Sequence, residues 1–257
     1  MATARENAIN LYMHGIRDGH PEEAVKAYTG ARYTQHSTGV EDGAEGFIKF
    51  FKPFIENNPI RDIQIVRALQ DGRKVFVTAY QSLNNGEAEW VTTDFFDSDE
   101  DGKIIEHWDV IAPFTGPNPS GRTQVDGPTE ITDPDKTEDN RRLVENFIQT
   151  VLIDDKVDRV EEFINPNKYL QHNSEVGDGL DHFMALWNQS NRPLTYQENF
   201  MTVAEGNFVA TLNRARYEDQ DLCQVDIFRV EEGLIVEHWD NSEPVPPQDE
   251  WANSGKF

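Results

Sequence analysis

The sequence predicts an α+β fold class, with two tandem modules that each wrap a curved sheet on a layer of helices into a cone with an open mouth. Two unlike motifs repeat in the same order. Tyr33-Thr34-Gln35-His36 recurs as Tyr169-Leu170-Gln171-His172, and Glu106-His107-Trp108-Asp109 recurs as Glu237-His238-Trp239-Asp240. The offsets, 136 and 131 residues, far exceed the roughly 20 to 50 residues of a solenoid repeat. Each copy is therefore a whole domain, and its helices-first order is that of an α+β fold.

The first half of each module is predicted to be helical. Each copy opens with an amphipathic helix, because residues at helical spacing share one face; they are Asn7, Leu11, Tyr12 and Ile16, then Leu143, Phe147, Ile148 and Leu152. A second short helix is expected over residues 22–28 and 157–163. A brief strand then carries the Tyr-x-Gln-His motif. In the next helix, Asp42 and Asp178 stand three residues before an acidic residue, a capping-box spacing that predicts a helix cap.

The second half of each module alternates between apolar and polar residues, as strands do. We expect strands in the first copy over residues 64–66, 75–79, 89–96 and 103–111, and in the second over 202–203, 208–213, 222–230 and 234–239. Turn residues such as Asp71 and Gly72 separate consecutive runs. These runs predict an antiparallel sheet.

The domain boundaries follow from composition. Residues 1–114 form the first module, 115–137 a linker or wrapping arm, and 138–257 the second module with a C-terminal tail. The linker holds four prolines, which remove hydrogen-bond donors and disfavour regular structure. Both the linker and the tail begin just after a Glu-His-Trp-Asp strand, so we expect them to share a role in covering a module mouth or a neighbour.

The charge balance restricts the partners. The chain has 23 basic and 47 acidic residues, a net charge of −24, which argues against nucleic acid, since that binding depends on Lys and Arg, and against anionic membranes. No apolar run approaches a membrane span or a signal peptide. Cys223 is the only cysteine and reads as a strand residue, so no internal disulfide can form. A cytoplasmic protein is expected.

The repeated motifs, Tyr-x-Gln-His…Asp-Gly and Gly-x-Ile-x-Glu-His-Trp-Asp, resemble the SnoaL-like branch of the nuclear transport factor two superfamily, in particular its predicted aldol-condensation and polyketide-cyclase-type proteins. The likeness covers nearly all of both copies except the linker. It implies a cone-shaped α+β barrel, and an intramolecular pseudo-dimer packed sheet to sheet, with further homo-oligomers open. The superfamily includes polyketide cyclases, ketosteroid isomerase, scytalone dehydratase, limonene epoxide hydrolase and non-catalytic members, so fold analogy does not select a reaction.

The resemblance also implies site residues. In ketosteroid isomerase the base is a carboxylate near the end of the corresponding first strand, and His36 and His172 occupy what resembles that place. Histidine can take and return a proton near neutral pH, which makes both candidate proton shuttles. Tyr33 and Tyr169 would donate a hydrogen bond to a developing enolate. Beside them, Gln35 and Gln171 are expected to line the pocket.

The last strand offers two alternatives, because side chains alternate between its faces. If His107 and Asp109 face the cavity, they form a His–Asp couple, as His238 and Asp240 would in the second copy. If the other face lines the cavity, Trp108 and Trp239 become walls for stacking a substrate. The sequence leaves both open. A metal held by His36, His107 and Asp109 would have suitable ligands, but no short-range ligand spacing supports it, so no metal is predicted.

The predicted function is a cofactor-free acid–base enzyme of cyclase, isomerase or dehydratase type, acting on a small apolar carbonyl compound. The alternative is a non-catalytic module that binds a small apolar ligand within a pseudo-dimeric scaffold. The copies differ where a ligand would rest, since Thr34 becomes Leu170 and Ser37 becomes Asn173. Either the two pockets bind different ligands, or one has stopped working.

Overall fold

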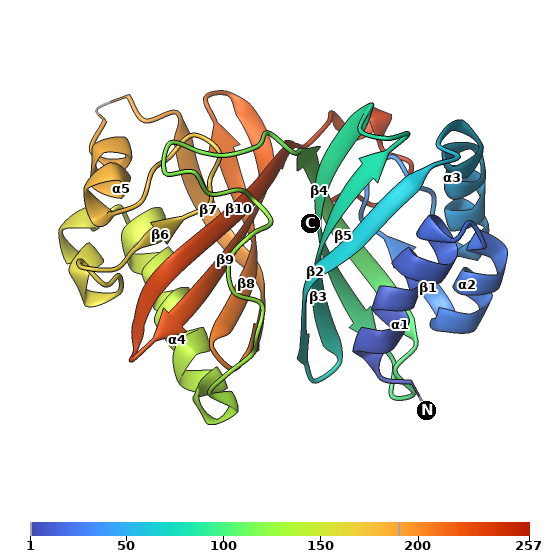
Figure 1. Cartoon of the computed structure of the whole chain (residues 1–257), viewed down its shortest axis with the longest axis horizontal. Helices are drawn as coiled ribbons and strands as arrows, with labels where there is room; N and C mark the ends of the chain where they lie inside the picture. Colours follow the sequence, from blue (N-terminus) through green and yellow to red (C-terminus); the bar gives the residue numbers. More distant parts are fainter. Residues whose placement is uncertain (1, 190) are drawn as a thin grey trace. The chain divides into compact units, whose positions relative to one another are not determined.

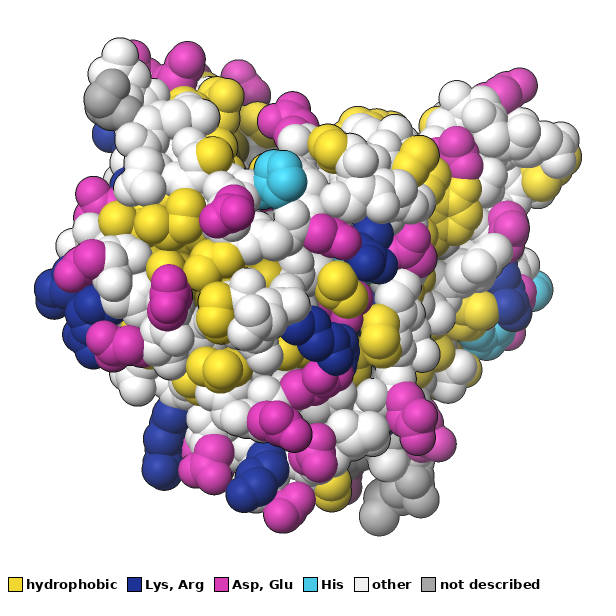
Figure 2. Space-filling view, turned by 60° about the vertical axis from the view of Figure 1, so that its left-hand side comes forward, with side chains coloured by type: hydrophobic (Ala, Val, Ile, Leu, Met, Phe, Trp, Pro, Cys, Tyr) yellow, Lys and Arg dark blue, Asp and Glu magenta, His cyan; other side chains and the backbone are white. Residues whose placement is uncertain are grey.

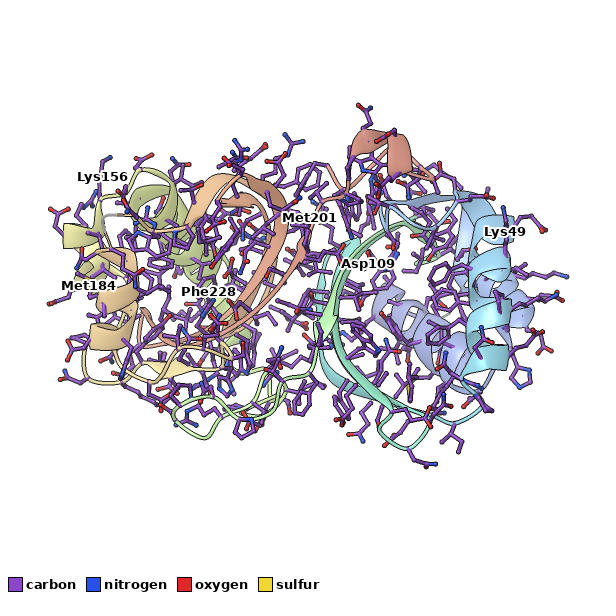
Figure 3. The ribbon with its side chains drawn as sticks, turned by 90° about the horizontal axis from the view of Figure 1, so that it is seen from above. Lys49, Asp109, Lys156, Met184, Met201 and Phe228 are labelled. Atoms are coloured by element: carbon purple, nitrogen blue, oxygen red, sulfur yellow. The ribbon has the colours of Figure 1, made fainter. Side chains whose placement is uncertain are left out.

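The computed structural model describes residues 2–189 and 191–257, and they divide into two compact units. Module 1 comprises the chain up to Phe114 together with Pro246–Phe257, and module 2 is Thr115–Val245. Within each module a layer of helices lies against one face of a curved sheet (Figure 1). Seen from above, Phe228 of module 2 lies between the helices and the sheet, whereas Lys49 points into solvent (Figure 3).

Both modules have the same order of elements. Module 1 contains α1 Ala4–Asn10, η1 Leu11–Arg17, α2 Pro21–Tyr28, β1 Thr29–Gln35, α3 Gly43–Asn57, β2 Arg61–Asp71, β3 Lys74–Leu83, β4 Ala88–Ser98, β5 Ile104–Pro113 and, near the C-terminus, η5 Gln248–Glu250. Module 2 contains η2 Pro134–Lys136, α4 Thr137–Phe147, η3 Ile148–Ile153, η4 Val157–Glu162, β6 Leu170–Gln171, α5 Leu180–Trp187, β7 Leu194–Glu205, β8 Phe208–Tyr217, β9 Gln220–Glu231 and β10 Leu234–Pro244. The predicted fold class, two tandem cone-shaped α+β modules, is confirmed.

The sheets explain why the two motifs repeat together. Their strand orders are β1-β5-β4-β3-β2 and β6-β10-β9-β8-β7. Four strands are antiparallel as predicted, but β1 and β6 pair in parallel with β5 and β10, which a crossover through all the intervening elements makes possible. In this register Gln35 lies opposite His107, and Gln171 lies opposite His238. The Tyr-x-Gln-His and Glu-His-Trp-Asp motifs are therefore neighbours in each sheet.

The helices begin differently from the prediction. Asp42 occupies the N-cap position of α3 but makes no side-chain cap hydrogen bond. Its carboxylate accepts instead from the backbone N–H of Gln35 at 2.7 Å, and Asp178 accepts from Gln171 at 2.9 Å. These carboxylates fasten the first strand to the start of the helix. The predicted capping role is wrong, because the strand end lies closer to the carboxylate than the helix N–H groups do.

The predicted domain boundaries need a correction at both arms. The C-terminal arm, Pro246–Phe257, belongs to module 1, although it follows the last strand of module 2. Residues 115–133, which we call the linker arm, belong to module 2, although they follow the last strand of module 1. The C-terminal arm therefore continues from module 2 but packs with module 1, and the linker arm continues from module 1 but packs with module 2.

Equivalent contacts hold the two arms. The side-chain amide of Asn253 donates to the carbonyl oxygens of Ser37 and Val40, at 2.6 and 2.9 Å. The amide of Asn118 donates to the carbonyl oxygens at 173 and 176, at 3.2 and 3.0 Å. These acceptors are the same two loop positions in the two copies, so both arms use one binding mode.

The visible surface is acidic. Asp and Glu side chains are spread over it and outnumber Lys and Arg (Figure 2). Among the residues the structure describes, no helix is both long enough and apolar enough to cross a membrane.

Candidate functional site

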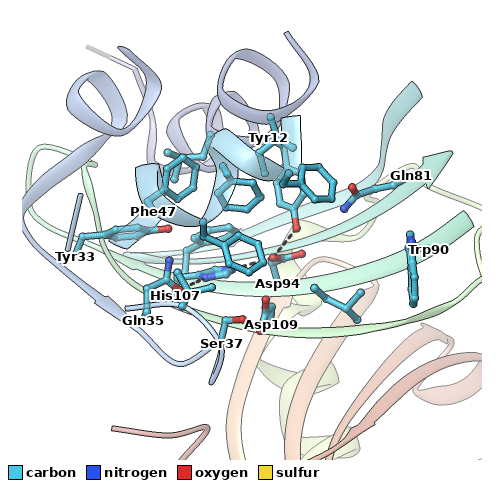
Figure 4. Close-up of a pocket in the computed structure, with 18 residues that line it drawn as sticks. Tyr12, Tyr33, Gln35, Ser37, Phe47, Gln81, Trp90, Asp94, His107 and Asp109 are labelled. Atoms are coloured by element: carbon cyan, nitrogen blue, oxygen red, sulfur yellow. Dashed lines mark hydrogen bonds and ion pairs between the residues drawn. The ribbon is translucent and has the colours of Figure 1, made fainter. Parts of the chain in front are cut away.

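Module 1 contains a cavity of about 250 Å³ between the helices and the sheet (Figure 4). Its wall is mostly apolar, formed by Leu11, Ile16, Val40, Phe47, Phe50, Phe51, Phe54, Trp90, Phe96 and Ile111. Phe50 and Ile111 are also exposed on the surface, so they mark the mouth. A concave, mainly apolar pocket with a few convergent polar groups is the usual form of a small-molecule site.

Asp94, on β4, is the centre of the polar wall of this cavity. Its carboxylate is fully buried, and Oδ1 accepts from the Tyr12 hydroxyl at 2.7 Å and lies 2.9 Å from Nε2 of His107. Oδ2 has no hydrogen-bond partner among the described residues. Burial raises the pKa of Asp94 above its ordinary value, although His107 opposes the rise. Asp94 therefore contributes to the cavity wall a buried carboxyl group, one oxygen of which has no hydrogen-bond partner among the described residues.

His107, on β5, is held from both sides. Nδ1 lies 2.8 Å from Oε1 of Gln35, its neighbour in the sheet, and Nε2 faces Asp94. The ring also stacks on Phe96, with centroids 4.8 Å apart. These contacts leave the imidazole no freedom to turn, so it fixes the orientation of Asp94.

Asp109, two residues along β5, has a different electrostatic setting. Its carboxylate accepts from the ammonium of Lys256, on the C-terminal arm, at 2.8 Å. Burial would raise the pKa of Asp109, but Lys256 and then His107 outweigh burial and lower it below its ordinary value. Asp94 and Asp109 thus line one cavity with pKa shifts in opposite directions. Such divergence between neighbouring carboxyl groups is a sign of separate acid–base roles.

The structure decides between the two alternatives for the last strand. His107 and Asp109 line the cavity of module 1, and His238 and Asp240 line that of module 2. Trp108 is on the opposite face of β5, as is Trp239 on β10. The pocket role predicted for the two tryptophans is therefore wrong, because strand alternation turns them away.

His36 and His172 also lie outside the cavities, which corrects their expected placement. Gln35 points inward, so alternation turns the next residue, His36, outward. There its ring stacks on Trp108, and its nitrogens contact Glu106 Oε1 at 2.9 Å and the carbonyl oxygen of Gly255 at 2.6 Å.

His172 repeats this arrangement in module 2. It stacks on Trp239 and contacts Glu237 Oε1 at 2.8 Å and the Thr123 carbonyl oxygen at 2.7 Å. Both histidines thus hold arms in place. The metal set of His36, His107 and Asp109 is not brought together, because His36 is on the other face.

Tyr33 and Gln35 line the cavity of module 1, as Tyr169 and Gln171 line that of module 2. Tyr33 packs edge-on against Phe47, at a centroid separation of 6.2 Å. Burial is the main reason why the pKa values of Tyr33 and Tyr169 are raised. Both hydroxyls therefore stay protonated and able to donate.

Module 2 keeps the polar wall but closes the cavity, which has a volume of only about 70 Å³. Asp226 takes the place of Asp94, with His238 Nε2 at 3.0 Å and the Tyr196 hydroxyl 3.0 Å from both carboxylate oxygens. Asn213 Nδ2 also donates to Asp226 Oδ2 at 2.9 Å. Both carboxylate oxygens of Asp226 are thus occupied.

The pairing of strands locates this difference. Asp94 pairs with Val77 on β3, and Asp226 pairs with Thr211 on β8. Two residues further on, β8 carries Asn213, whereas β3 carries Ala79. An alanine has no amide to occupy Asp94 Oδ2. The unpartnered oxygen in module 1 therefore corresponds to two differences, the alanine at this position and a tyrosine, Tyr12, that contacts only Oδ1 of Asp94.

Sequence reasoning missed Asp94, Tyr12 as its donor, and Lys256. A usable sign of Asp94 exists, since Asp94 and Asp226 each stand in a run of buried strand residues and two before a phenylalanine. An unexplained carboxylate in an apolar strand is unusual unless it is paired. Lys256 had no comparable sign, because its partner is 147 residues away along the chain.

Metal binding can be considered for Asp94, His107 and Asp109, whose candidate ligand atoms all lie within 4.8 Å of one another. The donor types suit a divalent cation. The ammonium of Lys256 already neutralises Asp109, however, and repels a cation. These contacts fit a hydrogen-bonded acid–base wall better than a metal centre.

These observations define a class: cone-shaped α+β modules, one of which encloses an apolar cavity with an acid–base wall. Residues 10–107 match the family model of the SnoaL-like domain. These residues make up most of module 1, so module 1 is similar to the SnoaL-like domain. Module 2 repeats its motifs and strand order.

Solved structures with this fold each cover a share of the chain about one module long. A candidate polyketide cyclase from Bacillus cereus ATCC 10987 is 20% identical and covers 42% of this chain and 71% of its own, with a TM-score of 0.36. A candidate ketosteroid isomerase from Kribbella flavida DSM 17836 is 18% identical and covers 44% and 87%, with a TM-score of 0.38. An M. tuberculosis LEH-like epoxide hydrolase is 18% identical and covers 42% and 85%, with a TM-score of 0.36. No curated protein sequence matches this chain.

Proposed function

We propose that module 1 is a cofactor-free acid–base enzyme, of cyclase, isomerase or dehydratase type, that acts on a small, largely apolar carbonyl compound. The observation that carries this proposal is the unpartnered Oδ2 of Asp94 in the wall of an apolar cavity. A cavity of about 150 Å³ holds benzene, so one of about 250 Å³ suits a compound of one or two rings.

Asp94 acts as the base. Its Oδ2 takes the proton from a carbon next to the substrate carbonyl, and the electron pair of the broken C–H bond moves to the carbonyl oxygen as an enolate. The raised pKa of Asp94 brings the carboxyl closer to neutrality, where a group can both take and return a proton. The same residue then returns the proton to a different atom.

The neighbouring residues support that transfer. Tyr12 and His107 hold Oδ1 of Asp94, which leaves Oδ2 without a hydrogen-bond partner among the described residues. Tyr33, whose hydroxyl stays protonated, donates to the enolate oxygen, and such a preorganised donor contributes about 3 to 4 kcal/mol to transition-state stabilisation. The surrounding phenylalanines exclude water, which strengthens these interactions.

Module 2 has a non-catalytic role in this proposal. Its cavity of about 70 Å³ is too small for a ring compound, and neither oxygen of Asp226 is free. The polar groups there stabilise the module instead. This corresponds to the expectation from the sequence that one of the two pockets has stopped working.

The test is Asp94→Asn, with Asp226→Asn as the matched control. Hydrogen–deuterium exchange at the carbon next to the carbonyl is followed by NMR in D₂O, over a panel of one- and two-ring ketones. Asp94→Asn should slow exchange by about 10²- to 10⁴-fold, while Asp226→Asn keeps the wild-type rate. Circular dichroism checks that both variants are folded.

Two results would count against the enzyme. If Asp94→Asn exchanges as fast as the wild type, Asp94 is not the base. If wild-type protein binds the ketones, as quenching of Trp90 would show, and releases them without exchange, then module 1 is a binding module.

A further inference from the structure

We propose that Lys256, on the C-terminal arm, is a positioning residue of the module 1 site. Lys256 keeps Asp109 ionised as a carboxylate, so the site depends on the C-terminal arm. The inference rests on the proposed function for its kinetic readout only. It adds to the acid–base wall a residue that lies 147 positions away from its partner in the sequence.

The contact between Lys256 and Asp109 is a buried one. The ammonium donates to the carboxylate Oδ1 at 2.8 Å and to the backbone carbonyl of the same residue at 2.5 Å. Lys256 is 1% exposed and Asp109 is 7% exposed. Lysine is almost never buried unless it is paired, so this ammonium has a defined partner and not a solvated surface contact.

The arm is anchored immediately before Lys256. The carbonyl oxygen of Gly255 lies 2.6 Å from the ring of His36, and the backbone N–H of Ala252 donates to the carbonyl of Thr38 at 2.8 Å. Gly255 has a φ of +96°, and a Cβ there would lie 2.3 Å from the ring of Trp251. The chain can therefore make this turn only with glycine, and the turn directs the next side chain to Asp109.

Lys256 changes the electrostatics of the whole polar wall. Atoms of Asp94, His107 and Asp109 lie within 4.8 Å of one another, so without Lys256 the two carboxyl groups cannot readily both ionise, and the pair keeps one proton to a higher pH. An opposite charge within about 4 to 6 Å, such as the Lys256 ammonium beside Asp109, lowers a carboxyl pKa by about 1 to 3 units. By holding Asp109 ionised and compensated, Lys256 leaves Asp94 as the group that exchanges a proton with substrate.

Module 2 lacks this device. Asp240, the counterpart of Asp109, accepts from the amide of Asn173 at 2.6 Å, and burial raises its pKa. The cation on the linker arm, Arg122, pairs with Asp178 instead. An arm therefore supplies a cation to the cavity wall only in module 1, and Arg122 offers a matched control.

The experiment compares Lys256→Met, Lys256→Arg and Arg122→Met in the full chain. Hydrogen–deuterium exchange is measured as a function of pH with the ketone that exchanges fastest in the wild type. The rise of the rate at low pH, the acid limb of the profile, reports ionisation of the base. Lys256→Met should move that limb upward by about one pH unit or more. Lys256→Arg should restore the wild-type limb, and Arg122→Met should leave it unchanged. A wild-type profile for Lys256→Met, or a failure of Lys256→Arg to restore it, overturns the proposal.

A second readout needs no catalysis. Infrared spectroscopy detects the carbonyl band of a protonated carboxyl group, and Lys256→Met should gain such a band near neutral pH that is absent from Lys256→Met/Asp109→Asn. The double variant carries no unpaired charge, so it also shows that the arm still folds. If the band is gained while neither the wild type nor any variant catalyses hydrogen–deuterium exchange of a ketone, the proposed function fails and the role of Lys256 stands. If no band is gained, the role of Lys256 fails.

Discussion

Replacing His172 by glutamine should destabilise module 2 strongly. The ring is fully buried, and its nitrogens face only acceptors: Glu237 Oε1 at 2.8 Å, the Thr123 carbonyl at 2.7 Å and Asp126 Oδ1 at 2.8 Å. The ring can therefore serve these acceptors only as a hydrogen-bond donor. Glutamine has one donor group in place of two ring nitrogens, so at least one of these contacts is lost, while Glu237 keeps its contact with Arg229 at 2.6 Å. Breaking one partnership of a buried charge costs about 3 to 5 kcal/mol.

The matched control is His36→Gln in module 1. Its partner Glu106 is 20% exposed, whereas Glu237 is completely buried, so water can compensate the loss and the cost should be about 1 to 2 kcal/mol. Urea unfolding followed by circular dichroism measures both, and limited proteolysis reports release of the arms. Equal losses in the two variants, or a larger loss for His36→Gln, would refute the argument from burial.

Two further predictions compare the modules. Ala79→Asn should supply an amide that occupies Asp94 Oδ2 and should abolish hydrogen–deuterium exchange of the ketone in a folded protein. Ala79→Val, which is similar in size but has no donor, should keep that exchange, and an active Ala79→Asn variant would contradict the importance of the unpartnered oxygen. For His238, burial lowers the pKa but Asp226 outweighs burial, so the pKa is raised in the folded protein. The contribution of His238 to the free energy of unfolding is therefore complete below the pKa of the unfolded chain, about 6.5, and is lost as the pH rises through the pKa of the folded protein. His238→Gln should therefore destabilise the protein more at about pH 5.5 than at about pH 9, and urea unfolding that shows the reverse order would exclude this sign.

Much of the fold could be predicted because the repeat fixed the module size and the alternation of residues fixed the strands. The motif pairs also located the inner polar wall, since Gln35 and His107 are sheet neighbours. The face of β5 that points inward could not be predicted. Alternation divides the side chains of the strand between two faces, but it does not say which face lines the cavity. The misplacement of His36 followed from this, since an inward Gln35 requires an outward His36.

The arms could not be assigned from sequence for a different reason. Asn118 and Asn253 bind the same two carbonyl positions in loops that both copies possess. Each arm could therefore satisfy its hydrogen bonds on either module, and nothing local distinguishes the choices. The intramolecular pairing of the modules and a cytoplasmic location stay predictions.

The two copies place the same catalytic-looking groups in opposite energetic situations. Each has a buried aspartate against a histidine and a glutamine, yet the tyrosine that holds it comes from η1 in module 1, as Tyr12, and from β7 in module 2, as Tyr196. With Asn213 added, Asp226 is fully satisfied and stabilises its module. Asp94 keeps an unpaired buried oxygen, which costs about 1 to 3 kcal/mol. An unpartnered buried group in a native protein calls for an explanation, and a catalytic role is one such explanation. Asp94 Oδ2 thus differs from its counterpart in module 2 in both the tyrosine and the amide contact, and this difference supports the proposed role of Asp94 Oδ2 in module 1.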